Sequence, residues 1–186
     1  MGEGMAHCTG RVRGRGYAGH ERTFPGRHLR GGAKRGACIG ATKCGKGVKI
    51  EIVTDAQGIP IGLATDAASV PEVEMAGPAV AGIPASVEIP VGTPLIGDKA
   101  YDSDPLREEL AKDGFILISP HRDNRTKPST NDGRRLRRYQ RRWTVERTFA
   151  WLHSYRRFVI RYERSIGIYD GFVYLACAFT CINKLL

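Results

Sequence analysis

Apolar and polar residues alternate in two adjacent segments of the chain. Residues 48–55 (VKIEIVTD) alternate as they do in a strand with one buried face, and residues 61–67 (IGLATDA) form a second such run. The turn residues 56–60 (AQGIP) separate the two runs, so the pattern predicts an antiparallel hairpin. Residues 69–80 then favour a short helix with Ser69 as its N-cap.

A strand, a helix and a second strand are expected next. The apolar run 93–98 ends at Asp98, and FILISPH at 115–121 reads as another buried strand. Between them, residues 104–113 predict a helix that stops at Gly114. This order predicts a parallel βαβ unit. It also places Asp98 at the carboxyl end of a strand, where open α/β sheets bind their ligands.

Helices are expected in the last third of the chain. A long helix over residues 136–158 would turn Val145, Phe149 and Leu152 toward the core. A final helix is expected over residues 169–186. Its apolar stripe, interpreted as a plain packing surface, consists of Phe172, Leu175, Ala176, Phe179 and Leu186.

The N-terminal segment is rich in glycine and arginine and has little periodicity. We expect an irregular basic segment at residues 1–32 and a folded domain at residues 33–186. The net charge is +9 over residues 1–50, −9 over residues 51–118 and +10 over residues 119–186. The basic blocks indicate a surface that binds a polyanion. A ribosomal-type RNA binder is an alternative that this charge alone suggests.

Membrane association is not expected from the sequence. The N-terminus has no apolar signal region, and the longest apolar run, residues 171–182, is too short to span a bilayer. Cys177 and Cys181 lie one helical turn apart in that run and are expected to be reduced core residues. The sequence therefore predicts a cytoplasmic protein with no membrane partner.

One face of the long predicted helix combines several polar groups. Tyr139 and Arg142 lie seven and four residues before Glu146, and His153 lies seven residues after it. These four side chains project from roughly one face of a helix. The face is either part of a functional site or an exposed surface with an Arg142–Glu146 ion pair.

Asp98 and Glu146 are the candidate metal ligands. Carboxylates from different elements suit Mg²⁺ or Mn²⁺, which prefer oxygen ligands. A pair of such ions activates a water or a hydroxyl and stabilises the leaving oxygen of a phosphodiester. Seven arginines within residues 134–147 would hold DNA phosphates, although a solvated basic face is the alternative.

Five segments of the chain read, in order, PLIGDKAYDSDPLREEL, ISPHRDNRTKP, DGRRLRRYQRRWTVERTFAWL, RRFVIRYERS and GFVYLACAF. Together they resemble the transposases of the insertion-sequence-five group, within the insertion-sequence-four-like DDE class. The resemblance covers about residues 33–186. It implies a ribonuclease H-like α/β fold, with a mixed sheet and flanking helices.

The resemblance also implies metal-dependent DNA strand cleavage and transfer in the bacterial cytoplasm, at the nucleoid. DNA, as element ends and as target, is the implied partner, and a homodimer is left open. Asp98 matches the second catalytic aspartate of the family and Glu146 its catalytic glutamate, in the pattern Y-x₂-R-x₃-E-x₆-K. His153 stands where that pattern has Lys. The residues expected to contact DNA are Tyr139, Arg142, Arg138, Arg141, Lys99, Arg122, Arg125 and His153.

The first catalytic aspartate of the family has no counterpart. Its D-G-[ST]-F-like strand would lie shortly before residue 33, and residues 27–32 contain no Asp. We therefore expect the first strand to be missing or degenerate, which would leave a gap or an exposed edge in the sheet. The chain is then either one part of a working transposase or a catalytically dead DNA-binding remnant. Asp55 and Asp66, near strand ends or turns, are the alternatives for the missing aspartate, although a structural role is expected for both. Asp102 and Asp104, at the start of the following helix, are also expected to be structural.

Overall fold

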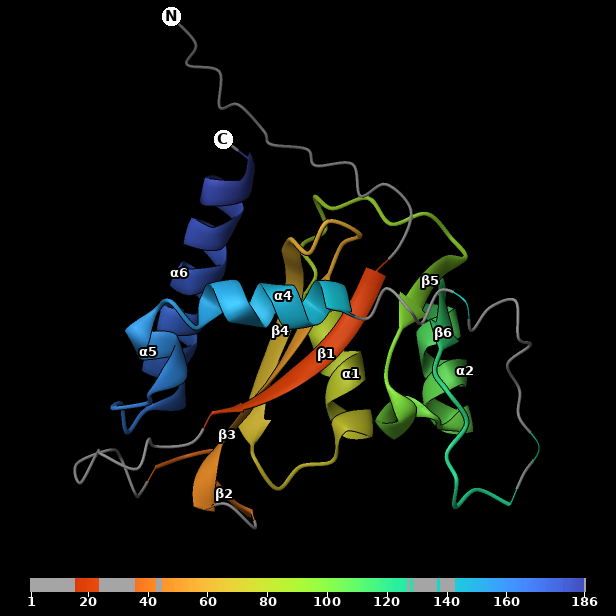
Figure 1. The fold of residues 1–186 in the computed structure, drawn as a ribbon, viewed down its shortest axis with the longest axis horizontal. Helices are drawn as coiled ribbons and strands as arrows, with labels where there is room; N and C mark the ends of the chain where they lie inside the picture. Colours follow the sequence, from red (N-terminus) through yellow and green to blue (C-terminus); the bar gives the residue numbers. More distant parts are fainter. Residues whose placement is uncertain are drawn as a thin grey trace, which may run out of the picture.

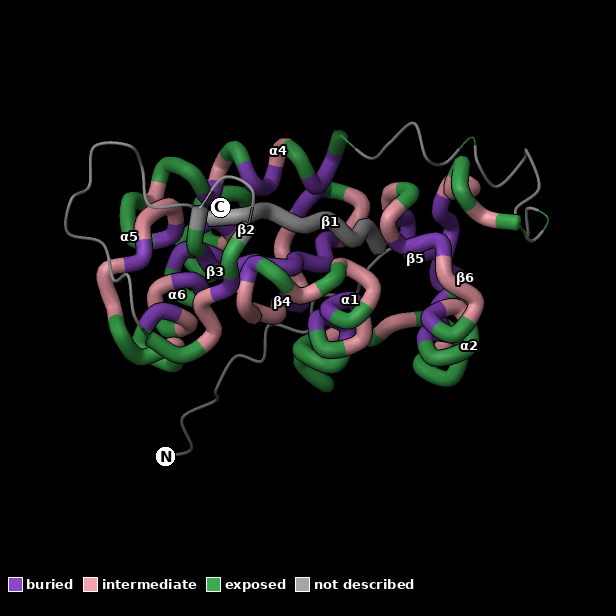
Figure 2. Tube along the Cα trace, turned by 90° about the horizontal axis from the view of Figure 1, so that it is seen from below, coloured by how far each residue is buried: buried purple, intermediate pink, exposed green. Residues whose placement is uncertain are grey.

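The structure is a computed structural model that describes residues 16–23, 36–42, 45–126, 128, 137 and 143–185. A six-stranded mixed sheet forms its centre, in the order β2-β3-β1-β5-β6 with β4 paired to β3 (Figure 1). Helix α4 lies on one side of the sheet, and helices α1 and α2 lie on the other (Figure 2). The expected α/β architecture, a mixed sheet with flanking helices, is therefore confirmed.

The predicted hairpin is present. Strand β3 (Gly45–Thr54) pairs antiparallel with β4 (Pro60–Ala67), and Gly58 turns between them at a φ of 87°. A positive φ favours glycine because it has no Cβ. The following helix α1 (Glu72–Ala81) begins after Pro71, so the expected N-cap at Ser69 is wrong. Proline suits this position because its fixed φ matches a helix start and its missing N–H is not needed there.

The first strand is not missing. Strand β1 (Gly16–Thr23) pairs antiparallel with β3 from Tyr17↔Thr54 to Thr23↔Val48, and parallel with β5 at its start. The expectations of a gap in the sheet and of irregular structure are therefore wrong for residues 16–23. The strand lies earlier than residues 27–32, which fall outside the described residues. It contains no Asp, so the sequence is degenerate while the strand itself is present.

The predicted βαβ unit is also confirmed. Strands β5 (Thr93–Ile96) and β6 (Phe115–Ile118) pair in parallel, with Leu95 opposite Leu117. They are joined by the short 3₁₀ helix η1 (Lys99–Tyr101) and by helix α2 (Asp104–Lys112). The short strand β2 (Gly40–Thr42) extends the sheet beside the start of β3.

Two hydrophobic clusters fill the two faces of the sheet. We call them the α4-side core and the α2-side core, after the helices that cover them. The α4-side core contains Val48, Ile50, Ile52, Leu63, Ile96, Ile118, Val145, Phe149, Leu152, Phe158, Tyr169, Val173, Ala176 and Cys177. The α2-side core contains Val53, Ala76, Ala79, Val80, Leu95, Tyr101, Leu106, Leu110, Phe115 and Leu117.

The long helix predicted over residues 136–158 is interrupted. Helix α4 (Trp143–Leu152) ends before His153, and α5 (Arg156–Val159) is a separate short turn. The interruption lets fully buried Phe158 enter the α4-side core, with its ring centroid 6.4 Å from that of Phe149. Because α4 ends at Leu152, His153 belongs to the turn that follows the helix.

The last helix, α6 (Ile166–Leu185), turns a different face to the core than expected. Ala176 is buried, but Leu175 and Phe179 are about half exposed. The residues that pack inward are instead Tyr169, Val173, Ala176, Cys177 and Thr180.

Helix α6 is also longer than the apolar run 171–182. Residues Ile166–Lys184 have the length and apolarity of a membrane-crossing helix. Its inward face is part of the α4-side core, and 28% of that apolar window is buried. The expectation that the apolar segment is too short to span a bilayer is therefore wrong by length and composition. Cys177 is buried as expected, and burial raises the pKa of its thiol to about 12.

Candidate functional site

Asp98 lies two residues beyond the last residue of β5. Its backbone is extended, and its Oδ1 accepts a hydrogen bond from the Ala100 amide at 2.7 Å, which caps η1. Gly97 permits this arrangement, because a Cβ there would lie 2.7 Å from Cδ2 of Tyr101. Within the described residues, the other carboxylate oxygen of Asp98 makes no hydrogen bond. The strand end thus presents one carboxylate oxygen that its own turn does not use.

Tyr101 anchors this turn to the centre of the sheet. Its hydroxyl donates a 2.6 Å hydrogen bond to Oε1 of Glu51, and both side chains are fully buried. Burial raises the pKa of Glu51 well above its ordinary range, and it also raises the pKa of Tyr101. Within the described residues, Oε2 of Glu51 has no hydrogen-bond partner. A protonated Glu51 is the form that this environment favours.

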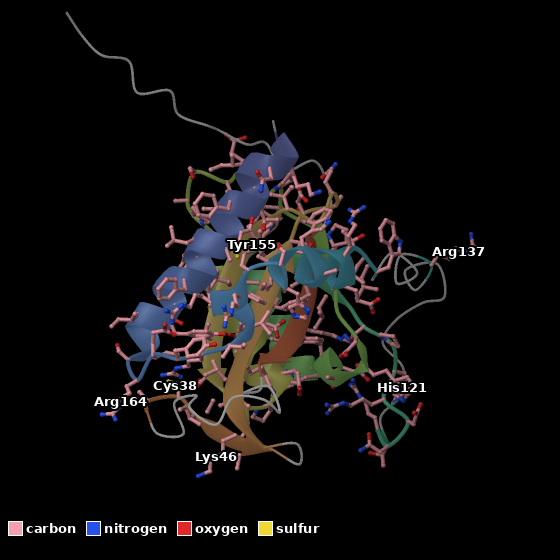
Figure 3. The ribbon with its side chains drawn as sticks, turned by 60° about the vertical axis from the view of Figure 1, so that its left-hand side comes forward. Cys38, Lys46, His121, Arg137, Tyr155 and Arg164 are labelled. Atoms are coloured by element: carbon pink, nitrogen blue, oxygen red, sulfur yellow. The ribbon has the colours of Figure 1, made fainter. Side chains whose placement is uncertain are left out.

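Asp102, two residues before the start of α2, holds the loop that follows β6. Its buried carboxylate binds the guanidinium of Arg107 at 2.6 Å and that of Arg125 at 2.7 Å, and it accepts the Arg122 amide at 3.0 Å. His121, labelled in Figure 3, lies 3.5 Å from the same carboxylate. Asp102 therefore has the structural role expected of it, through ion pairs.

Three of the expected DNA-contacting residues lie beside this turn. Arg122 donates to the carbonyls of Lys99 and Ala100, and Arg125 is paired with Asp102 and Asp104. Their guanidinium groups are thus engaged within the protein. The Lys99 ammonium pairs with Asp123 at the surface, where 55% of its side chain is exposed. Of the three, Lys99 is the side chain that solvent reaches most readily.

Glu146 is exposed on the first half of α4. The helix is fixed on the β3–β4 turn, where Thr148 donates to the Gly58 carbonyl at 2.6 Å and Arg147 donates to the Gln57 carbonyl. The neighbouring Val145 packs in the same core cluster as Ile96, which lies two residues before Asp98. Glu146 and the strand end that carries Asp98 therefore belong to one face of the sheet. The other members of the expected polar helix face, Tyr139 and Arg142, lie outside the described residues, as do Arg138 and Arg141.

Position 19 of β1 lies on the same face of the sheet as the strand end that carries Asp98. The parallel register ends at the pair Tyr17 and Ile96, and extending it by two residues in each strand brings position 19 level with Asp98. Gly19 is paired with Ile52 of β3, and paired residues of antiparallel strands face the same side of a sheet. Since Ile52 belongs to the α4-side core, position 19 faces α4. Glycine stands there.

Among the described side chains, three other carboxylates have partners elsewhere. Asp55 accepts from the amides of Gln57 and Ile59 in the hairpin turn, and Asp66 accepts from its neighbour's amide, as expected of structural residues. Glu51 belongs to the opposite face, with Tyr101. In the part of the chain that the structure describes, there is no group of three His, Cys, Asp or Glu side chains that could hold a metal ion.

The buried partners of Lys49 and Glu51 in β3 were not predicted from the sequence. Lys49 and Glu51 alternate with apolar residues in VKIEIVTD, which predicts a solvent-facing polar side, yet both are buried. Helices cover both faces of the sheet, and Lys49 is satisfied by Glu72 at 3.1 Å and by the Val70 carbonyl. No periodicity in one strand distinguishes a polar side chain facing water from one facing a buried partner.

The strand order, with an antiparallel β1-β3-β4 unit followed by parallel β5 and β6, defines a protein of the ribonuclease H-like fold. The chain belongs to the transposase DDE domain family, whose model matches residues 16–181. It is 36% identical over 144 residues to a protein named as a transposase for insertion sequence element IS402 from Burkholderia cepacia, covering 75% of this chain and 64% of that protein.

A second relative, named as a transposase for insertion sequence element IS6501 from Brucella ovis, is 36% identical over 88 residues. That match covers 45% of this chain and 63% of the relative, so the chain spans less than two thirds of either protein. A cryo-EM structure of a piggyBac transposase synaptic complex with hairpin DNA matches with a TM-score of 0.55, covering 89% of this chain and 45% of that one. At 12% identity, this likeness shows the fold alone.

Proposed function

We propose that this chain binds DNA in the bacterial cytoplasm as the catalytic part of an insertion-sequence transposase, acting at element ends. Family membership supports transposition, and the net charge of +10 supports contact with a polyanion. Lys99, beside Asp98, has a side chain that is 55% exposed and can reach a phosphate. Tyr139, Arg142, Arg138, Arg141 and His153 remain predicted contacts. Arg122 and Arg125 are proposed to shape the loop, because their guanidinium groups already have protein partners.

Asp98 and Glu146 are proposed to hold Mg²⁺ or Mn²⁺. Both are oxygen donors of the kind that these ions prefer, and one oxygen of Asp98 is not used by its own turn. When bound, the cation supplies Lewis-acid stabilisation of charge on a phosphodiester. The chain's own task is to hold the two carboxylates on one face of the sheet and to keep η1 fixed through Tyr101 and Glu51.

A second candidate function is DNA binding without strand cleavage. The observation that favours it is position 19, where the strand beside Asp98 carries glycine instead of a carboxylate. Two carboxylates hold fewer ions, and hold them more weakly, than three converging ones. We therefore propose that the chain as it stands binds DNA and cleaves it poorly.

DNA binding is tested by fluorescence anisotropy on a labelled duplex across a range of salt concentrations. A transposase that contacts several phosphates should lose affinity linearly on a log–log plot, with a slope of about −0.9 per phosphate contacted. Lys99→Ala should reduce that slope by about one, whereas Lys112→Ala, at the end of α2, should not. An absence of duplex binding at low salt would contradict the proposal, and tighter binding to structured RNA would favour the RNA-binder alternative.

The metal site is tested separately by isothermal titration calorimetry with Mn²⁺. The native chain should bind the ion weakly, and Asp98→Asn and Glu146→Gln should each abolish the signal. Asp113→Asn, an exposed carboxylate after α2, is the matched control and should leave it unchanged. Equal binding by all four proteins would show that the ion sits elsewhere.

A further inference from the structure

Helix α6, strand β4 and the end of α1 surround a pocket that lies apart from the candidate site. Its volume is about 190 Å³, and its walls are mostly apolar, with Ile61 of β4, Pro84 after α1 and Tyr174 of α6 among them. The backbones of β4 and α1 meet at its edge, because a Cβ at Gly62 would lie 2.5 Å from the Ala79 carbonyl oxygen. An engineered apolar cavity of roughly 150 Å³ binds benzene, so this pocket has room for one aromatic ring.

Two cysteine side chains line this pocket, which we call the thiol pocket. Cys177 and Cys181 lie four residues apart on α6, so their side chains project from one face of the helix, one turn apart. Cys177 is 7% exposed, and the thiol of Cys181 donates a 3.7 Å hydrogen bond to the Pro60 carbonyl oxygen. Both are free cysteines. Neither thiol has a role in the proposed binding of DNA or of a divalent cation.

The spacing of these two thiols disfavours a disulfide between them. Residues four apart on a helix have their Cβ atoms roughly 5–6 Å apart, whereas a disulfide requires about 3.5–4.5 Å. Closing the bond would therefore distort α6. An atom bonded to both sulfurs spans a longer gap, because it replaces one S–S bond of about 2.05 Å by two bonds of about 2.3 Å, the length of a zinc–thiolate bond. The pair thus suits a ligand that accepts two thiolates at one atom.

The apolar surroundings of the thiol pocket favour a bridged product without charge. Burial raises the pKa of Cys177 to about 12, and burial together with the negative charge of Asp55 raises the pKa of Cys181. Both thiols are therefore protonated near neutral pH. Structural Zn²⁺ needs four ligands, and Cu⁺ held by two thiolates has a net negative charge that burial disfavours. A trivalent arsenic atom with one carbon group and two thiolates is neutral and needs no further ligand.

We propose that the thiol pocket binds trivalent organoarsenicals, with arsenic bridging Cys177 and Cys181 and its aromatic group in the apolar space. Phenylarsine oxide is the probe. Two As–S bonds form, the arsenic–oxygen bond breaks, and the two thiol protons leave with that oxygen as one molecule of water. Arsenic stays trivalent throughout, so the step needs no oxidant or reductant. It also needs neither DNA nor a divalent cation, so its test is independent of the proposed function.

The test uses the full chain with Cys8, Cys38 and Cys44 changed to Ser, which leaves only the two pocket thiols. Intact-mass spectrometry and thiol titration should show one arsenical bound and two thiols lost, and the thermal midpoint should rise by about 5 °C or more at a hundredfold excess over Kd. Adding Cys177→Ala or Cys181→Ala should weaken binding by roughly a hundredfold or more, because one thiol cannot chelate. In the unaltered chain, proteolysis should place the arsenical on the peptide that contains both cysteines. Absence of binding, equal binding after either Ala change, or an arsenical on Cys38 and Cys44 would overturn the proposal.

A second experiment tests whether the aromatic group occupies the pocket. Competition with dithiothreitol compares two arsenicals and cancels the intrinsic strength of their As–S bonds. Phenylarsine oxide should then bind roughly tenfold or more tightly than methylarsine oxide, because its ring is removed from water. Ala178→Phe keeps both thiols but fills the pocket from an exposed position of α6, so it should abolish this preference while the circular dichroism stays native. Equal binding of the two arsenicals by the native pocket, or an unchanged preference in Ala178→Phe, would contradict the assignment of the ring to the pocket.

Discussion

Strands β1 and β5 lie side by side in parallel, yet they differ in the candidate site residues that they contribute. Around β5, Asp98, Tyr101 and Asp102 bind specific partners over the short connection to α2. Strand β1 occupies the central place between β3 and β5 through a backbone ladder seven residue pairs long, and it contains no Asp. The comparison teaches that a strand's place in a sheet depends on its backbone, whereas a metal site depends on single side chains. The scaffold can therefore persist where the site is incomplete.

The largest effect is expected from breaking the β1 ladder itself. Gly19→Pro removes an N–H from the middle of a central strand and fixes φ, and it should destabilise the fold by about 3 kcal/mol or more. Gly19→Ala keeps the ladder and should change the free energy of unfolding by about 1 kcal/mol or less. Urea denaturation measures both. If Gly19→Pro is as stable as Gly19→Ala, β1 does not contribute to the folded sheet.

A smaller but still large effect is expected at the β5 side, where side chains matter. Asp102→Asn removes the charge that binds Arg107 and Arg125, and it should cost about 3 kcal/mol, the lower end for a buried pair, because the two arginine side chains keep 17% and 12% exposure. The matched control is Asp123→Asn, which breaks the exposed pair with Lys99 and should cost less than about 1 kcal/mol. Chemical denaturation measures the free energy of unfolding of both variants. If the two variants lose similar amounts, the buried ion pairs of Asp102 stabilise the fold no more than the exposed pair of Asp123.

The smallest effect is a pH dependence that arises from Glu51. Because the pKa of the folded Glu51 is raised by burial, its contribution to stability is fully present below its ordinary value of 4.5 and is lost as the pH rises toward the raised folded pKa. Glu51→Gln should remove this loss. The difference in free energy of unfolding should grow in favour of Gln by at most about 1.4 kcal/mol per pH unit.

This prediction is checked by urea unfolding of both proteins at pH 4.5, 6 and 7.5, a series of roughly one and a half pH units per step. The other carboxylates are the same in both proteins, so the difference between the two curves isolates Glu51. Parallel curves would mean that Glu51 ionises as easily in the folded chain as in the unfolded one. Tyr101→Phe should extend the decline to higher pH, because it removes the hydrogen bond that favours the ionised carboxylate and so raises the pKa of Glu51 further.

Much of the fold follows from local pattern. The β3–β4 hairpin and the β5–α2–β6 unit were predicted within a few residues, because alternation, turn residues and helix stops are local signals. Strand β1 was not predicted, because GYAGHERT has no strand periodicity and is placed by its neighbours. The outward face of α6 was misassigned for a related reason. A helix with two apolar stripes does not reveal which of them meets the core.

The candidate site was predicted in part. Asp98 was placed at a strand end, and Glu146 on a helix of the same face, from spacing and resemblance. The partners that support Asp98 were not predicted, since Glu51 lies 50 residues from Tyr101 in the sequence and looks like a solvent-facing strand residue. The protein partners of Arg122 and Arg125 were not predicted, for the same reason. Long-range ion pairs are invisible in a local pattern.

The most direct test of the account is the nicking of supercoiled plasmid DNA by Gly19→Asp in the presence of Mg²⁺ or Mn²⁺. The register places this carboxylate beside Asp98 on the α4 side, so we predict nicking that exceeds the native chain by about a hundredfold or more. The double variant Gly19→Asp with Asp98→Asn should lose that activity. His20→Asp, which pairs with Glu51 on the other face, should not gain it. Native chain that nicks as fast as Gly19→Asp, or equal gains at positions 19 and 20, would contradict the claim that the site lacks one carboxylate at position 19.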